Sequence, residues 1–170
     1  MMKSISSTKI LTALMLFCGL SLTANEALAR NNYVGQPQQL SMGAFYGGHI
    51  GATATYILSS RNAIDVAAAM EMGGQENTSG WADYLWIYPD AFAMMDWSFG
   101  WYWGGGVKIR TENDPEVEEL YLAGPRGVAG LTNILESMPV ELFAEAAFTY
   151  HITQATKTEF DIALGARYYF

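Results

Sequence analysis

The chain ends on the stretch Phe160-Asp161-Ile162-Ala163-Leu164-Gly165-Ala166-Arg167-Tyr168-Tyr169-Phe170. Every second residue counted back from Phe170 is apolar, whereas those between them are mostly small or charged. This period-two alternation predicts a β-strand with two different faces. Its length suits a tilted strand that crosses a bilayer, which needs about 9–11 residues. A transmembrane β-barrel puts such a strand between lipid and a polar interior, and its last strand closes onto its first.

The same residues carry a family resemblance. The ending Gly165-x-x-Tyr168-x-Phe170 resembles the C-terminal assembly signal of bacterial outer-membrane barrels, although the polar residue expected two positions before the glycine is Ala163. The resemblance implies recognition by the outer-membrane assembly machinery. The overall plan resembles the small eight-stranded barrels of the outer membrane protein A and X type, and the last third of the chain is similar to small barrels of unassigned function.

The N-terminal residues 1–29 have the pattern of a secretory signal peptide. Two lysines and a short apolar run precede the small-x-small cleavage site Ala27-Leu28-Ala29. The run is too short for a spanning helix, which needs about 20 residues. The single cysteine, Cys18, lies inside this segment, so no thiol chemistry is expected in the mature chain. We therefore predict a signal peptide, 1–29, and one outer-membrane β-barrel domain, 30–170.

Composition and charge agree with a membrane barrel. The net charge is −8, which disfavours nucleic acid as a partner because nucleic-acid binding needs a basic surface. Charged residues make up 15% of the chain and aromatics 14%, whereas a soluble surface alone carries about 25–35% charged side chains. The expected partners are outer-membrane lipids, lipopolysaccharide and the assembly machinery, and the expected state is a monomer. No cofactor is expected.

Turn signals divide the chain into eight strand segments, all antiparallel. We expect them at about residues 40–47, 50–58, 63–72, 81–88, 97–110, 121–134, 140–151 and 160–170. Pro89-Asp90 is expected to end the fourth. If the N-terminus is periplasmic, the short connections fall on the periplasmic side and most of the long ones outside, as in outer-membrane barrels.

The strand faces decide which side meets lipid. The fifth segment has one apolar face, formed by Trp97, Phe99, Trp101, Trp103, Val107 and Ile109. Its other face contains Gly104 and Gly106 of a glycine run, which we expect to relieve crowding. An eight-stranded barrel has an interior that side chains only just fill. The bulky apolar faces should therefore point outwards, and the polar, glycine- and alanine-rich faces should point into the lumen.

This orientation places charged side chains inside the barrel, where they must be paired. The predicted network is Asp65, Glu71, Asp83, Lys108, Arg110, Arg126, Glu141, Glu145, Asp161 and Arg167. Folding the last two strands about residues 152–159 puts Phe143 opposite Arg167, with Glu141 and Glu145 as its diagonal partners. The main prediction is a salt-bridged plug, and the alternative is a small gated conduit or proton-sensitive lumen.

Catalytic and metal motifs are weak in this chain. His151-Ile152-Thr153-Gln154 is comparable with the His-x-Ser-Asn stretch of outer-membrane lipid A deacylases, but threonine and glutamine replace the serine and the asparagine. The acidic loop 111–120 lacks the glycine and spacing of a calcium loop. We assign no catalytic, cofactor-binding or metal residues and expect a structural or interaction protein without enzyme activity. The alternatives are a lipid-modifying outer-membrane enzyme and a soluble periplasmic barrel that binds an apolar ligand.

Overall fold

The computed structural model describes residues 39–71, 77–94, 97–112, 120–135, 138–153 and 156–170. The predicted signal peptide lies outside the described residues, as does most of the acidic loop. Within the described ranges, no helix is long and apolar enough to cross a membrane.

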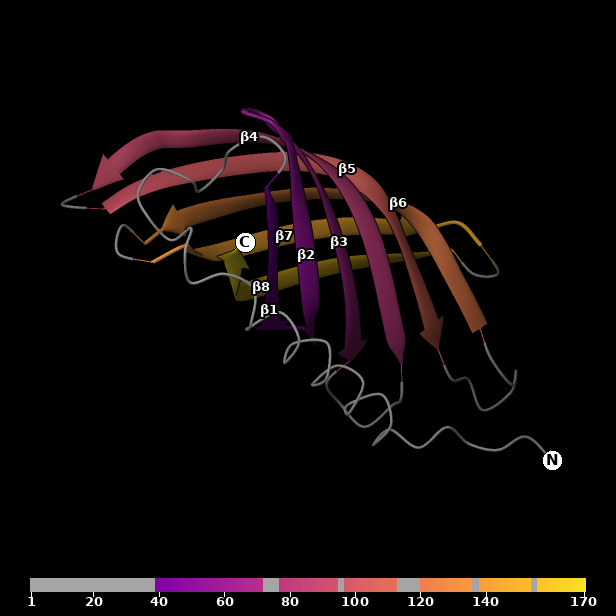
Figure 1. The fold of residues 1–170 in the computed structure, drawn as a ribbon. Coiled ribbons are helices and arrows are strands. Elements are labelled where there is room, and N and C mark those ends of the chain that lie inside the picture. Colours follow the sequence, from indigo (N-terminus) through magenta and orange to yellow (C-terminus); the bar gives the residue numbers. More distant parts are fainter. Residues whose placement is uncertain (1–38, 72–76, 95–96, 113–119, 136–137, 154–155) are drawn as a thin grey trace, which may run out of the picture. The chain divides into compact units, whose positions relative to one another are not determined.

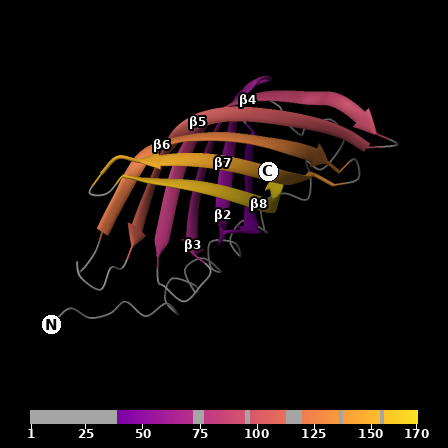
Figure 2. The ribbon, with the colours of Figure 1, turned by 180° about the vertical axis from the view of Figure 1, so that it is seen from behind.

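Eight antiparallel strands form one closed barrel in which each strand pairs with its neighbours in sequence (Figures 1 and 2). The strands are β1 (Leu40–Gly47), β2 (His49–Ser59), β3 (Asn62–Glu71), β4 (Thr78–Met94), β5 (Trp97–Glu112), β6 (Leu120–Ile134), β7 (Val140–His151) and β8 (Lys157–Tyr169). The predicted up-and-down eight-stranded barrel is therefore confirmed.

The barrel closes between its first and last strands. Gly43 lies opposite Arg167 in the β1–β8 ladder, and the backbone N–H of Phe170 donates to the carbonyl oxygen of Leu40 over 2.9 Å. The chain enters and leaves the barrel at this end, which is also where the β2–β3, β4–β5 and β6–β7 connections lie. We call it the terminal end and the opposite one the loop end.

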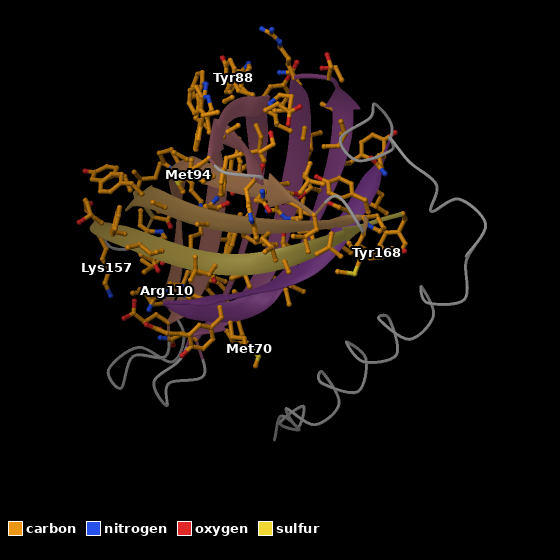
Figure 3. All side chains as sticks on the ribbon, turned by 90° about the vertical axis from the view of Figure 1, so that its left-hand side faces the viewer. Met70, Tyr88, Met94, Arg110, Lys157 and Tyr168 are labelled. Atoms are coloured by element: carbon orange, nitrogen blue, oxygen red, sulfur yellow. The ribbon has the colours of Figure 1, made fainter. Side chains whose placement is uncertain are left out.

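Alternate side chains point to opposite sides of the wall, as predicted. On β8, Phe160, Ile162 and Leu164 are 66%, 59% and 62% exposed, whereas Arg167 is 3% exposed. Met70 and Tyr168 likewise project outwards from the barrel (Figure 3). Large apolar side chains on the outside and buried charges on the inside are the reverse of a water-soluble protein's arrangement.

The prediction that Pro89-Asp90 ends the fourth strand is wrong. β4 continues to Met94 and pairs with β5 through Phe92↔Phe99, with a register irregularity after Tyr88. β3 begins at Asn62, opposite Trp86, so the last part of β4 has no β3 neighbour. Proline is tolerated there because its missing N–H removes no ladder hydrogen bond at a strand edge. Asp90 takes a positive φ of 50° within this irregularity.

The predicted register of the last hairpin is wrong by two residues. Glu141 lies opposite Arg167, and Phe143 lies opposite Gly165. β8 begins at Lys157, which pairs with His151, so the connection is shorter than the 152–159 loop on which the prediction rested. Because the shift is an even number of residues, each side chain keeps its face while its cross-strand partner changes.

Candidate functional site: the charged lumen

The ten predicted lumen residues all lie on inward faces, and most are buried. They gather into three groups, each of which brings cations between carboxylates from several strands. We call these the Arg167, Arg126 and Lys108 layers. Once Glu159, which was not predicted, is added to the Lys108 layer, each layer contains one more carboxylate than it has lysines and arginines.

The Arg167 layer lies nearest the terminal end. Arg167 Nη2 is 3.1 Å from Asp65 Oδ1, and its Nη1 is 3.8 Å from Glu141 Oε1. The guanidinium carbon lies 4.0 Å from the centre of the Phe143 ring, which gives a cation–π contact. Of the two predicted partners of Arg167, Glu141 lies beside its guanidinium group. Asp65 takes the place predicted for Glu145.

Hydroxyl groups donate further hydrogen bonds to these carboxylates. Thr53 and Thr55 donate to Asp65 Oδ1 over 2.9 and 2.6 Å, and Tyr169 donates to Glu141 Oε2 over 2.7 Å. Buried carboxylates need such donors because burial removes their water. The supporting residues were absent from the predicted network, which was built from charged residues alone.

The Arg126 layer occupies the middle of the barrel. Arg126 Nη1 contacts Asp83 Oδ2, and its Nη2 is 2.7 Å from Glu145 Oε1. Tyr102 donates its hydroxyl to Glu145 Oε2 over 2.7 Å, and the guanidinium carbon is 4.7 Å from the centre of the Trp81 ring. These contacts join β4, β5, β6 and β7 across the lumen.

The Lys108 layer lies towards the loop end. Lys108 Nζ is 2.7 Å from Asp161 Oδ2 and 3.0 Å from Glu159 Oε1. Arg110 links the same Glu159 Oε1, at 3.0 Å, to Glu71 Oε2, at 2.6 Å. Sequence reasoning missed Glu159 because it was assigned to the loop, yet it shares the alternating inward face of Asp161 and Arg167.

Both histidines of the chain belong to the Lys108 layer. His49 Nδ1 is 3.3 Å from Asp161 Oδ1, and His151 Nε2 is 2.9 Å from Glu159 Oε2. Ligand atoms of His49, Glu159 and Asp161 lie within 4.8 Å of one another, so this trio could hold a metal ion. The Lys108 ammonium already contacts both carboxylates, however, and a divalent ion would sit against that positive charge.

Little empty space remains between two of the layers. A cavity of about 10 Å³ lies between the Arg167 and Arg126 layers, lined in part by Phe45, Trp81 and Phe143. This is no more than the space needed for about one water molecule. The arrangement suits a cross-linked interior better than a conduit.

The weak deacylase-like stretch does not assemble as a catalytic site. His151 turns inwards to Glu159, whereas the Thr153 hydroxyl donates to the carbonyl oxygen of Tyr121 and accepts from the N–H of Ala123. A nucleophile and its base must lie within hydrogen-bonding reach. Both groups are engaged with other partners here, and Gln154 lies outside the described residues.

The three residues of the predicted C-terminal assembly signal face in two directions. Tyr168 and Phe170 point outwards, and their rings meet edge to face with centroids 5.2 Å apart. Gly165 points inwards and lies opposite both Phe45 and Phe143 in the two adjoining ladders. A glycine at this position leaves room for the Phe143 ring.

No family model and no curated protein matches this chain. The structure is similar to the N-terminal β-barrel domain of Pseudomonas aeruginosa OprF, with a TM-score of 0.65 and 13% identity over 79% of this chain and 98% of that one. It is also similar to a transmembrane β-barrel designed de novo, with a TM-score of 0.51 and 13% identity over 81% of this chain and 100% of that one. At these identities the similarity establishes the fold, which is that of a small transmembrane β-barrel.

Proposed function

We propose that this protein is a small outer-membrane β-barrel of structural or interaction type, whose lumen is plugged by paired charges. The observation that carries the proposal is the distribution of side chains across the wall. Apolar and aromatic residues cover the outside, and the lysine and arginines of the lumen are buried against carboxylates. A bilayer is the solvent that suits such an exterior.

The plug favours a role for the outer surface over transport through the barrel. The three layers connect strands on opposite sides of the lumen through ion pairs, and the cavity between two of them has a volume of about 10 Å³. A solid barrel of this kind offers its partners the lipid-facing wall and the connections at each end. Contributions to envelope integrity or surface contacts are therefore the roles that we propose.

We expect the protein to be recovered in the outer-membrane fraction of expressing cells. A folded barrel should also migrate differently on a gel before and after heating, because its closed ladder resists detergent until it is heated. Recovery in the soluble periplasmic fraction, without a heat-dependent shift, would contradict the proposal. That result would favour the soluble binder, whose apolar faces would have to point inwards.

The lipid-modifying enzyme makes a different prediction. If His151 acted as a general base, His151→Gln should abolish hydrolysis of lipid A or phospholipid by the purified protein while leaving its gel shift intact. The buried contact between His151 and Glu159 favours a structural role instead. We therefore expect no lipid hydrolysis by the unmodified protein under the same assay.

The C-terminal aromatic provides a separate test of assembly. We expect Phe170→Ala to reduce the amount of folded barrel in the outer membrane several-fold, because the proposed assembly machinery would no longer recognise the chain end. Phe160→Ala is the matched control, since Phe160 lies on β8, which ends immediately before Phe170, has the same outward orientation and is 66% exposed. An equal loss of the two variants in cells would contradict a signalling role for Phe170. A loss of Phe170→Ala on refolding in detergent that equals its loss in cells would contradict it as well.

A further inference from the structure

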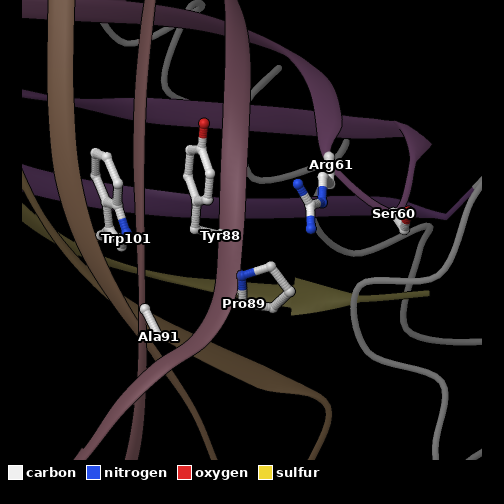
Figure 4. A pocket seen from close by; sticks show the side chains of 6 residues that line it. All are labelled: Ser60, Arg61, Tyr88, Pro89, Ala91 and Trp101. Carbon is white, nitrogen blue, oxygen red and sulfur yellow. The ribbon is translucent and has the colours of Figure 1, made fainter.

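A notch lies in the outer wall beside the last part of β4, which has no β3 neighbour. β3 begins at Asn62, opposite Trp86, whereas β4 extends to Met94. The cavity beside this step has a volume of about 330 Å³ (Figure 4), within the size range of small-molecule sites. Its lining consists of Ser60, Arg61, Tyr88, Pro89, Ala91 and Trp101.

Arg61 differs from the other cations in the described part of the chain. Lys108, Arg110, Arg126, Lys157 and Arg167 each contact a carboxylate within 4.0 Å. Within the described ranges, Arg61 has no such partner. It lies on the β2–β3 turn and is exposed.

The backbone holds Arg61 in place independently of its guanidinium group. Its carbonyl oxygen accepts from the N–H of Ile87 over 2.8 Å, and its own N–H donates to Ser59 Oγ over 3.3 Å. Asp90, the acidic group on the nearby segment of β4, accepts from Ser98 Oγ over 2.6 Å. The guanidinium, turned towards β4 in Figure 4, is therefore available to an anion from outside the chain.

Aromatic side chains adjoin the notch on the outer wall. The rings of Tyr88 and Trp101 stack with centroids 4.6 Å apart, and those of Trp86 and Trp103 stack at 4.5 Å one step further along the strands. Tyrosine and tryptophan favour the depth at which a bilayer changes from headgroups to acyl chains. A cation beside these stacked rings can contact a lipid headgroup while the rings contact the acyl chain of the same lipid.

We propose that this notch binds the phosphate group of an anionic glycerophospholipid in the leaflet at the terminal end of the barrel. Arginine suits phosphate because its planar guanidinium can donate two parallel hydrogen bonds. The lining contains one cation and no carboxylate, so a ligand with a net negative charge fits better than a zwitterionic one. This inference rests on the proposed membrane location and adds to it one lipid class and one site.

The test is native mass spectrometry of the barrel purified from membranes in a neutral detergent. The probes are phosphatidylglycerol and phosphatidylcholine with identical acyl chains. We expect one phosphatidylglycerol to bind the unmodified protein about tenfold more tightly than phosphatidylcholine, and Arg61→Gln to remove this preference. Arg61→Lys should retain part of it, because a lysine keeps the charge without the paired donors.

Lys157→Gln is the matched control, because Lys157 is an exposed cation near the loop end and is already paired with Glu112. It should leave the lipid preference unchanged, and the heat-dependent gel shift should show that every variant is folded. Equal binding of phosphatidylglycerol by the unmodified protein and Arg61→Gln would overturn the site. Displacement of the lipid by millimolar inorganic phosphate would overturn the lipid as its ligand. Either result leaves the membrane location to be decided by fractionation.

Discussion

Arg167→Ala is expected to lower the free energy of unfolding by about 3–5 kcal/mol, the typical cost of removing one partner from a buried ion pair. Arg167 is 3% exposed and is the cation that faces both Asp65 and Glu141 in its layer. Its removal leaves two buried carboxylates facing only neutral donors. Urea denaturation of the barrel in lipid vesicles, followed by the gel shift, should show the loss as a lower midpoint.

Two comparisons separate charge pairing from the loss of side-chain volume. Lys157→Ala removes an exposed pair with Glu112 and should change stability by no more than about 1 kcal/mol. Arg167→Met combined with Asp65→Asn and Glu141→Gln removes the cation and both negative charges together, and should recover much of the lost stability. An unchanged midpoint for Arg167→Ala would contradict the pairing, and failure of the triple variant to recover stability would assign the effect to packing.

The faces of the strands could be predicted from sequence because alternation is a local property. In β5 the inward positions of Lys108 and Arg110 follow from the outward positions of Trp103, Val107 and Ile109. No partner needs to be known for such an assignment, since a strand's side-chain period is two whatever lies beside it. The fold and the residues that face the lumen can therefore be predicted from the local sequence pattern.

The partners inside the lumen depend on register, which alternation leaves open by any even number of residues. The predicted loop 152–159 was longer than the connection between His151 and Lys157. With the shorter connection, the cross-strand neighbour of Arg167 is Glu141 and not Phe143. The contact with Asp65 needed more information still. It crosses the lumen between strands that are not neighbours in the ladder, so its geometry depends on the closure of the whole barrel.

The extension of β4 was hidden for a different reason. Pro89 is a good signal for the end of a strand when both edges of that strand are paired. Here the edge facing β3 is unpaired after Ile87, so the proline does not stop the ladder with β5. The aromatic pairs Phe92–Phe99 and Tyr88–Trp101, stacked across β4 and β5, were the available signal for a longer hairpin.

Gly106→Val is expected to prevent the barrel from folding or to destabilise it by at least about 3 kcal/mol, the upper end of the usual cost of overpacking. A Cβ at Gly106 would overlap the carbonyl oxygen of Ala82 and crowd Asp83 on the neighbouring strand. A flexible side chain could turn away from such an overlap, but a backbone carbonyl in the β4–β5 ladder cannot. Displacing Asp83 would also weaken its ion pair with Arg126.

Gly105→Val is the matched control within the same glycine run. Gly105 faces outwards, and a Cβ there would meet the carbonyl oxygen of Arg126 at 3.5 Å, an ordinary contact. Valine at that position adds an apolar group towards the proposed lipid and favours extended backbone, so we expect a change within about 1 kcal/mol. Refolding yields in detergent and urea midpoints in vesicles should therefore separate two substitutions of identical chemistry at adjacent residues. Equal tolerance of both would contradict an inward Gly106, whereas equal loss would show that the wall itself cannot accept a β-branched residue at either position.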